Sequence, residues 1–417
     1  MRARSHPGGV LLGCVLLATL AGCDASPAAP DPTATPKPRA DEPDGAPTSE
    51  AAEDGAARAT PAPTSFDLAA IDAYVAAEVE RLGLVGLSLA IMRGGELVLA
   101  KGYGVRSRAT GEPVTPETGF AIASISKQFI CAAGLLLEQD GALSLDDPIA
   151  KYFPTLTRAG DIQLIDALQH VSGYHDFYPL DFVIPRMQAP IETDALIAEF
   201  AGMPLDFEPR ARFSYSNTGY LIVGRALERV SGQALASLLS ARIFEPQALT
   251  NTSFGGPARP EQAATGYTAF ALDEPEPAIP EGDGWIHAAG AMWSTPSDLL
   301  RWDLALTTGG VLSPASYERM TTPAQLRDGR TTDYACGLGV RRFEGESILV
   351  HTGGVSGFSS KNAFVPRTRS GVALISNGAG ANAKPIADAI LSLVIEEDQG
   401  AAKAPAIAGP PPEQVAR

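Results

Sequence analysis

The apolar positions of this chain change their spacing along its length, and each change indicates a different kind of secondary structure. Residues 67–82 carry an apolar residue at about every fourth position, which predicts an amphipathic helix. Two apolar runs, residues 87–92 and 96–100, flank a short turn that holds Gly94 and Gly95. This arrangement is typical of a β-hairpin.

The pattern is different from about residue 140 to residue 284, where helical spacing and loops rich in Pro and Gly replace the alternating runs. Helices are expected in this region at residues 162–169, 193–200 and 219–230. Beyond it we expect a helix, four short antiparallel strands and a closing helix, at residues 296–306, 336–340, 347–351, 361–365, 371–376 and 385–396. Strands at both ends and helices between them predict an α/β (α+β) fold. One antiparallel sheet would be flanked by helices, with a mainly helical domain inserted at about 140–284.

The N-terminus has the features of an export signal. A basic start is followed by a short apolar run, and that run ends in Leu-Ala-Gly directly before Cys23. This order resembles the lipobox of bacterial lipoproteins, in which the signal is cut before the cysteine and the cysteine is lipidated. We therefore expect a signal peptide at residues 1–22 and lipidation at Cys23. An ordinary signal peptide with an unrelated cysteine is the alternative.

The segments next to the two termini lack the composition of a folded core. Residues 23–65 are rich in Pro, Ala, Asp, Glu and Thr, so they are expected to form a disordered tether. Residues 400–417 are rich in Ala and Pro and are expected to form a disordered tail, which leaves a folded domain at residues 66–399. A lipid anchor followed by a tether predicts an extracytoplasmic location on a bacterial membrane, in the periplasm or at the cell surface.

Charge and composition narrow the classes of partner and cofactor. The net charge is −16, from 32 Lys and Arg against 48 Asp and Glu, which argues against nucleic acid as a partner. None of the 5 histidines has the spacing of a metal ligand, so no metal or other cofactor is expected. Two cysteines lie in the folded part, Cys131 and Cys336. Their spacing does not decide whether they form a disulfide. The favoured interpretation is two buried thiols that act as small apolar residues.

The strongest candidate for chemistry is the S-x-x-K sequence that Ser124 and Lys127 form. The apolar stretch after it predicts a buried helix, and residues three apart lie on one face of a helix. The hydroxyl of Ser124 and the ammonium of Lys127 are therefore expected side by side at the first turn. A serine hydroxyl is a poor nucleophile until a neighbour takes its proton, and a lysine in a dry pocket has a lowered pKa that suits this role.

Tyr215 and Asn217 form a second candidate. A buried tyrosine next to a cation loses its proton more easily and so can act as a base. The asparagine offers both a donor and an acceptor. A core tyrosine in a turn is the structural alternative.

The third candidate is His351-Thr352-Gly353-Gly354, which follows an apolar strand. Glycines at a strand end allow a substrate to approach the backbone closely and leave N–H groups free for an oxyanion. A plain strand end with a turn is the alternative. We interpret residues 287–299 as a loop that enters a capped helix, with a structural role and not a catalytic one.

In this order, the three motifs resemble those of the penicillin-recognising serine hydrolase superfamily. Part of that superfamily has S-x-x-K, S-D-N and K-T-G. The similar branch contains class C β-lactamases, D-alanyl-D-alanine carboxypeptidases and related esterases, and its class C members have Y-x-N in the second motif, as this chain does. Flanking stretches at 141–148, 170–173 and 213–220 fit as well, and the resemblance covers residues 66 to 396. It implies a sheet domain and a helical domain with the active site between them.

The resemblance also implies a role for each motif residue. Ser124 would form an acyl-enzyme that water hydrolyses, and Lys127 and Tyr215 would share the proton transfers. Backbone N–H groups of Ser124 and Gly354 would form the oxyanion hole. The residues implied in substrate binding are Asn217, His351, Thr352 and Gly353.

One departure changes the expected substrate. His351 stands where the lactamases and peptidases usually have a lysine that attracts the substrate carboxylate, and a histidine near neutral pH is mostly uncharged. The expected function is therefore hydrolysis of a small ester or amide, esterase-like or D,D-peptidase-like, with a peptidoglycan stem peptide among the candidate substrates. β-Lactamase activity is the first alternative. A non-catalytic module that binds peptidoglycan or a partner protein is the alternative from another class.

Overall fold

The computed structural model describes residues 60–178, 184–255, 260–269, 274–378 and 382–403. The predictions for the signal peptide, for lipidation at Cys23 and for most of the tether and tail lie outside these residues. Residues 60–65, which belong to the predicted tether, are described, and the backbone N–H of Thr60 donates to Glu78 Oε1 at 3.1 Å. The last of the tether is therefore attached to the fold.

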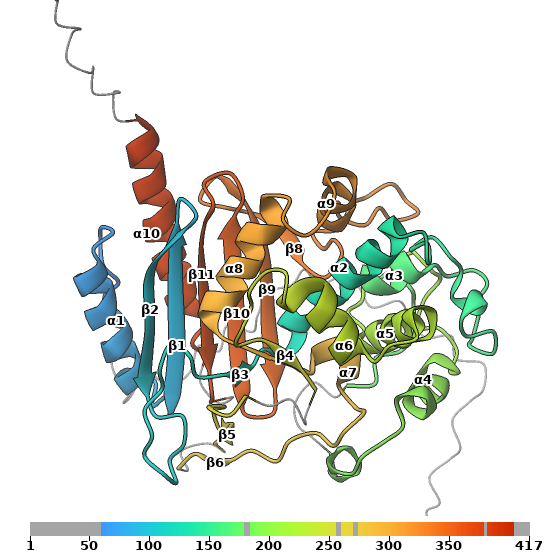
Figure 1. Ribbon diagram of the computed structural model, residues 1–417, viewed down its shortest axis with the longest axis horizontal. Helices are drawn as coiled ribbons and strands as arrows, with labels where there is room; N and C mark the ends of the chain where they lie inside the picture. The colour runs from blue at the N-terminus through green and yellow to red at the C-terminus, as the bar shows by residue number, and fades with distance from the viewer. Residues whose placement is uncertain (1–59, 179–183, 256–259, 270–273, 379–381, 404–417) are drawn as a thin grey trace, which may run out of the picture. The chain divides into compact units, whose positions relative to one another are not determined.

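A six-stranded antiparallel sheet in the order β2-β1-β11-β10-β9-β8 forms the centre of the described structure (Figure 1). Its strands are β1 (Gly86–Arg93), β2 (Glu96–Gly104), β8 (Gly339–Phe343), β9 (Glu346–Val355), β10 (Phe358–Val365) and β11 (Ser370–Ser376). The register Leu89↔Leu374 pairs a strand from the first part of the folded domain with a strand from its last part. This confirms that one sheet is built from both ends.

Helices cover the two faces of this sheet, because strand β1 is apolar on both sides of its pleat. Leu87, Leu89 and Ile91 pack in a core with α1 (Leu68–Arg81) and α10 (Lys384–Lys403). Ala90 and Met92 point to the other face, whose core includes α8 (Pro296–Thr307). Asp67 caps α1, since its carboxylate accepts from Ala70 N at 2.7 Å.

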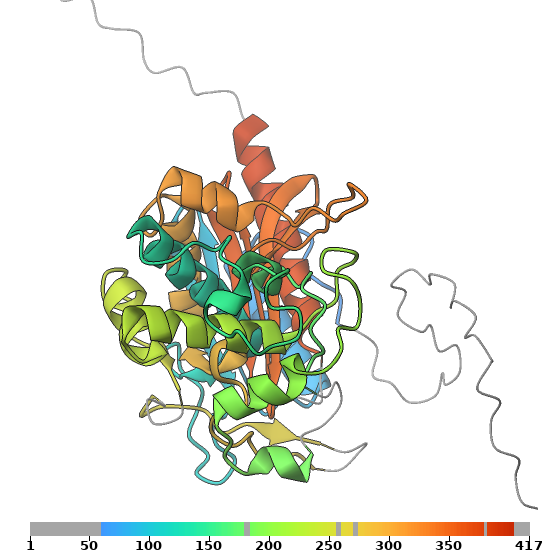
Figure 2. The same ribbon diagram turned by 90° about the vertical axis from the view of Figure 1, so that its right-hand side faces the viewer.

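The remaining helices lie next to the part of the sheet that β8, β9 and β10 form. This side of the molecule faces the viewer in Figure 2. These helices are α2 (Ser126–Gln139), α3 (Leu164–Leu168), α4 (Thr193–Ala201), α5 (Asn217–Ser231), α6 (Leu235–Leu239), α7 (His287–Gly290) and α9 (Pro314–Thr321), with single turns η1 (Ala123–Ile125), η2 (Ile149–Lys151), η3 (Pro185–Gln188) and η4 (Ser240–Phe244). Helix α2 is buried from Ser126 to Leu137 and forms the centre of this layer. Two small sheets complete the described fold: β3 (Phe120–Ala121), β7 (Met292–Ser294) and β4 (Ser253–Phe254), and the pair β5 (Tyr267–Thr268) and β6 (Glu276–Pro277).

The structure corrects the interpretation of the two cysteines in the folded part. Cys131 of α2 and Cys336 form a disulfide, with their Cα atoms 5.8 Å apart. Their separation of 205 residues gave no sign of this contact, which the packing of α2 against the segment before β8 creates.

Other elements also differ from the predictions, among them β9, which continues to Val355 beyond the predicted end at 351. Strand β8 begins at Gly339, after the predicted start at 336, because Cys336 is held in the disulfide and Gly337 has φ +78°. The stretch 287–299 contains a short helix and a strand before α8, since β7 pairs with β3 on one side and β4 on the other. Helix α10 continues to Lys403, beyond the predicted end at 396 and into the predicted tail.

Among the described residues, no helix has the length and apolarity that a membrane span needs. No group of three or more His, Cys, Asp or Glu among them has the arrangement of a metal site.

Candidate active site

Ser124 lies at a tight strand-to-helix turn. Strand β3 ends at Ala121, and Ala123 then adopts φ +50°, a left-handed conformation that costs a residue with a Cβ about 1–3 kcal/mol. The turn is held by Ser126, whose Oγ donates to Ala123 O at 2.6 Å. The single turn η1 therefore presents Ser124, half-buried, directly before α2.

Lys127 lies one turn further along and is fully buried. Its Nζ is 3.1 Å from Ser124 Oγ, 2.8 Å from Asn217 Oδ1 and 2.6 Å from the carbonyl oxygen of Ala289. Burial lowers the pKa of Lys127 to about 7, and the negative charge of Asp176 opposes this fall. A large share of the lysine is consequently neutral at neutral pH.

Tyr215 and Asn217 approach this pair from the start of α5. Lys127 Nζ lies 5.0 Å from the ring centroid of Tyr215 and 5.1 Å from that of Tyr220. Burial raises the pKa of Tyr215, and its hydrogen bond with Ser124 opposes the rise. The phenol is therefore protonated in the resting site.

Asp176 completes the polar group, and sequence reasoning missed it. Its Oδ1 accepts the backbone N–H of Asn217 at 2.9 Å, and its Oδ2 accepts Asn217 Nδ2 at 3.1 Å. Burial raises the pKa of this carboxyl, and the N–H groups of Asn217 and Tyr178 limit the rise. The only signal for it in the sequence is an acidic residue in the loop just after the stretch 170–173. The contribution of Ala289 is a backbone carbonyl, which no side-chain motif reveals.

His351 does not lie among the residues that line the cavity at Ser124. The residue is 7% exposed, and its Nε2 is 2.9 Å from the hydroxyl of Tyr334. Its Nδ1 is 2.6 Å from Thr352 O, and because a carbonyl only accepts, Nδ1 carries the proton and Nε2 accepts from Tyr334. Burial lowers the pKa of His351 to about 3, so this position offers no positive charge near neutral pH. The predicted contact between His351 and substrate stays a prediction.

The other residues of the third motif lie in strand β9, which passes close to Ser124. Gly353 is packed against Ile122 O and Ser360 Oγ so closely that a Cβ would collide with both. Gly354 faces open space, and Thr352 is exposed. The structure thus brings Gly354 to the nucleophile and uses Gly353 for close packing.

A small cavity opens at the nucleophile, and no Lys, Arg, Asp or Glu among the described residues lines it. Its walls are Ala123, Ser124, Phe177, Tyr178, Asn217, Ile286, Ala289, Gly290, Gly354 and Val355. The motif residues Ser124, Asn217 and Gly354 therefore meet in one hollow, while Lys127 lies beneath it within reach of Ser124. Aromatic and aliphatic side chains form most of the remaining wall, which suits an uncharged substrate group.

The sequence of this chain is similar to those of known proteins. The model of the family described as Beta-lactamase matches residues 71–396. Penicillin-binding protein 4* of Bacillus subtilis is 30% identical over 287 residues, which cover 64% of this chain and 62% of that protein. A D-aminopeptidase of Brucella ovis is 28% identical over 301 residues, which cover 70% of this chain and 56% of that protein. The chain therefore spans less than two thirds of the length of either relative.

Solved structures give the same picture. A D-amino acid amidase from Ochrobactrum anthropi has a TM-score of 0.67 and 26% identity, covering 78% of this chain and 98% of that one. An octameric penicillin-binding protein homologue from Pyrococcus abyssi has a TM-score of 0.70 and 26% identity, covering 79% and 78%. The expected fold is confirmed by these similarities.

Proposed function

Because the chain belongs to the beta-lactamase family, whose relatives include serine hydrolases, we propose that it hydrolyses a small ester or amide through an acyl-enzyme on Ser124. Ser124 Oγ attacks the substrate carbonyl, its proton passes to a base, and the leaving group departs with a proton. Water then hydrolyses the ester to Ser124 and releases the acid.

The hydrogen bonds of Lys127 carry this proposal. A neutral lysine amine has two N–H groups, and two pure acceptors lie next to it, Asn217 Oδ1 and Ala289 O. With both N–H groups used, the remaining lone pair of Nζ is directed at Ser124 Oγ, 3.1 Å away. Because the pKa is about 7, this base form is well populated at neutral pH.

Tyr215 and the backbone supply the other roles. The phenol interacts with the Ser124 hydroxyl and is protonated, which suits a group that hands a proton to the leaving group. Backbone N–H groups of Ser124 and Gly354 form the proposed oxyanion hole, since both residues line the cavity. No metal or cofactor takes part in these steps.

The surroundings of the third motif favour substrates without a carboxylate at that position. His351 is buried, hydrogen-bonded and neutral, so it cannot replace a lysine as an anion-binding group. Amides without that carboxylate, the bond type that the names of the amidase and D-aminopeptidase relatives indicate, therefore fit better than β-lactams, and so do simple esters. A cell-wall peptide with a free carboxylate is a weaker candidate for the same reason.

The proposed location is outside the cytoplasm, anchored to a bacterial membrane through a lipid on Cys23. The Cys131–Cys336 disulfide supports export, because disulfides persist mainly in oxidising compartments.

The test is turnover by the purified full chain of 4-nitrophenyl acetate, D-alanine 4-nitroanilide and a chromogenic cephalosporin. We expect ester and amide turnover well above cephalosporin turnover, and a fluorophosphonate adduct on Ser124 by mass spectrometry. Ser124→Ala should remove both the adduct and at least about 10³-fold of kcat. Ser144→Ala, a serine beyond the other end of α2, is the matched control and should change kcat little. Turnover that survives Ser124→Ala would refute the mechanism, and dominant cephalosporin turnover would refute the substrate class.

A further inference from the structure

The base form of Lys127 depends on which way the amide of Asn217 points. Its Oδ1 accepts from Lys127 at 2.8 Å, and this contact occupies one N–H of the amine. If the amide were reversed, Nδ2 would face Nζ instead. Two donors would then compete for the lone pair that the proposed mechanism directs at Ser124.

Asp176 determines that orientation. It accepts the backbone N–H of Asn217 at 2.9 Å with one carboxylate oxygen and Nδ2 at 3.1 Å with the other. The backbone N–H of Tyr178 donates to Oδ1 at 3.3 Å and holds the carboxylate in turn. A carboxylate accepts at both oxygens, so reversal of the amide would place Asn217 Oδ1 against Asp176 Oδ2, and two acceptors would repel.

Asp176 is also the charged partner of Lys127 among the described residues. Four other titratable groups face the lysine or interact with its charge: His170, His351, Tyr215 and Tyr220. Burial lowers the pKa of both histidines and raises the pKa of both tyrosines, so all four are neutral near pH 7. The negative charge of Asp176 stabilises the ammonium form against the desolvation that opposes it.

We propose that Asp176 is a positioning residue for the acylation of Ser124: it clamps both N–H groups of Asn217, and thereby aims the lone pair of Lys127 at the serine hydroxyl. The proposal rests on the proposed function, because it assigns Asp176 a task in the same proton transfer. The negative charge of Asp176 also favours the ammonium form of Lys127, in opposition to the larger effect of burial.

Asp176→Asn removes the clamp without a change of size. An amide side chain accepts at only one atom, so the substituted side chain cannot satisfy both N–H groups of Asn217 in the present orientation. Reversal of the Asn217 amide or loss of one hydrogen bond must follow. We expect kcat for 4-nitrophenyl acetate to fall about 10–100-fold while KM changes by less than about threefold.

The same variant shifts the pH profile in a defined direction. Without the negative charge, the ammonium form of Lys127 is less stable, so the lysine loses its proton at lower pH. The acidic limb of the kcat–pH profile should move down by about one pH unit. Asp206→Asn is the matched control: Asp206 lies in the same region, its side chain is 39% exposed, and it contacts His175 instead of Asn217. Its profile should match the wild type.

A reciprocal double variant distinguishes positioning from loss of folding. In the double variant Asp176→Asn, Asn217→Asp, the side-chain amide is at position 176 and the carboxylate is at position 217. The amide N–H donates to that carboxylate, and the amide oxygen accepts the backbone N–H of residue 217, so both hydrogen bonds return. The carboxylate now contacts Lys127 directly, and the acidic limb should move to higher pH than in wild type. A merely structural role would not move the limb in opposite directions.

The measurements are kcat–pH profiles of the full chain from pH 5 to 9, thermal melting of each variant, and fluorophosphonate labelling of Ser124. An Asp176→Asn enzyme with wild-type kcat and limb would overturn the inference, as would a double variant that shifts to lower pH. Failure of the proposed function looks different, since wild type itself would then show no Ser124 adduct.

Discussion

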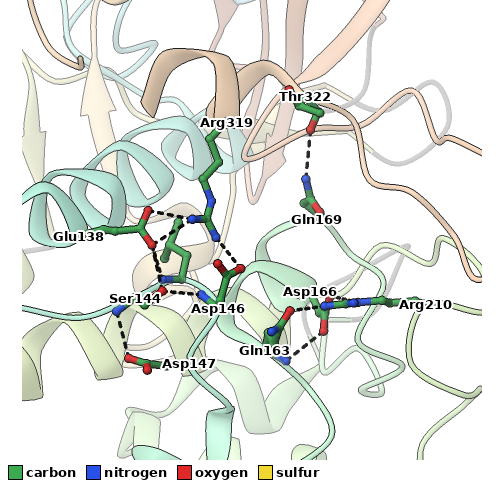
Figure 3. A network of polar contacts seen from close by, with 11 residues as sticks. Glu138, Ser144, Asp146, Asp147, Gln163, Asp166, Gln169, Arg210, Arg319 and Thr322 are labelled. Atoms are coloured by element: carbon green, nitrogen blue, oxygen red, sulfur yellow. Dashed lines mark hydrogen bonds and ion pairs between the residues drawn. The ribbon is translucent and has the colours of Figure 1, made fainter. Parts of the chain in front are cut away.

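The two ends of helix α2 carry charged side chains in opposite surroundings. At the start, Lys127 is 0% exposed, and the three atoms that it contacts belong to neutral groups: a hydroxyl, an amide and a backbone carbonyl. At the end, the Glu138 side chain is 20% exposed and lies between Arg319, at 3.1 Å, and the backbone N–H of Leu145, at 2.8 Å. Figure 3 shows Arg319 reaching both Glu138 and Asp146.

The difference shows that Glu138 has a structural role in holding segments together, whereas Lys127 is suited to proton transfer. Glu138 meets an opposite charge directly, so the pair links α2 to α9 and to the segment that follows α2. Lys127 has its opposite charge, Asp176, beyond Asn217 and not in direct contact. Desolvation then dominates and lowers the pKa of the amine to about 7, where it can exchange a proton with Ser124.

The largest effect that tests this comparison is on the rate. Lys127→Met keeps a long apolar side chain in the buried position and removes the amine. Because general-base catalysis contributes typically about 10²–10⁴-fold, kcat for an ester substrate should fall by that factor. The far end provides the control, since Glu138→Gln should leave kcat within about twofold. Equal losses in the two variants would show that α2 acts only as a scaffold.

The second effect is on stability as a function of pH. The pKa of Lys127 is about 7 in the folded protein, against 10.5 as the ordinary value of a lysine, so the unfolded chain binds more protons between these two pH values. Stability therefore rises with pH through this window, and the lysine contributes about 2 kcal/mol to that rise between pH 7 and pH 9. Urea unfolding of wild type and Lys127→Met at both pH values measures it. The rise should be smaller in the variant by this amount, and an identical slope in both proteins would contradict the lowered pKa.

The smallest effect belongs to the anchoring end. Glu138→Gln keeps an acceptor for the N–H of Leu145 but removes the charge that faces Arg319. For this partly exposed pair the free energy of unfolding should fall by about 1 kcal/mol, reduced by solvent screening. Asp146→Asn, whose carboxylate is 58% exposed, should cost less than about 0.5 kcal/mol. A loss at Glu138 of the size expected for a buried charge, with lower activity, would mean that the two ends are coupled.

Much of the fold follows from local pattern. The helix at 68–81, the hairpin of β1 and β2, the helices α4, α5 and α8 and the strands β9 to β11 all lie where apolar spacing predicts them. These elements could be predicted because each depends on its own periodicity and caps. The start of β8 and the strand β7 could not, because Cys336 and residues 292–294 take their conformation from partners far away in the sequence.

The sequence by itself determined the motifs, their order and the neighbourhood of Ser124 and Lys127, since a spacing of three residues places side chains on one helix face. Tertiary structure alone decided the partners of Lys127: the carbonyl of Ala289 and the amide of Asn217 come from segments 162 and 90 residues away. It also decided that His351 turns inward to Tyr334, that Cys131 and Cys336 meet, and that Asp176 holds Asn217. The physical reason is the same in each case. Burial and hydrogen bonds between segments that are distant in the sequence determine the charge and the orientation of these side chains. Such contacts cannot be predicted from the local pattern of apolar and polar residues.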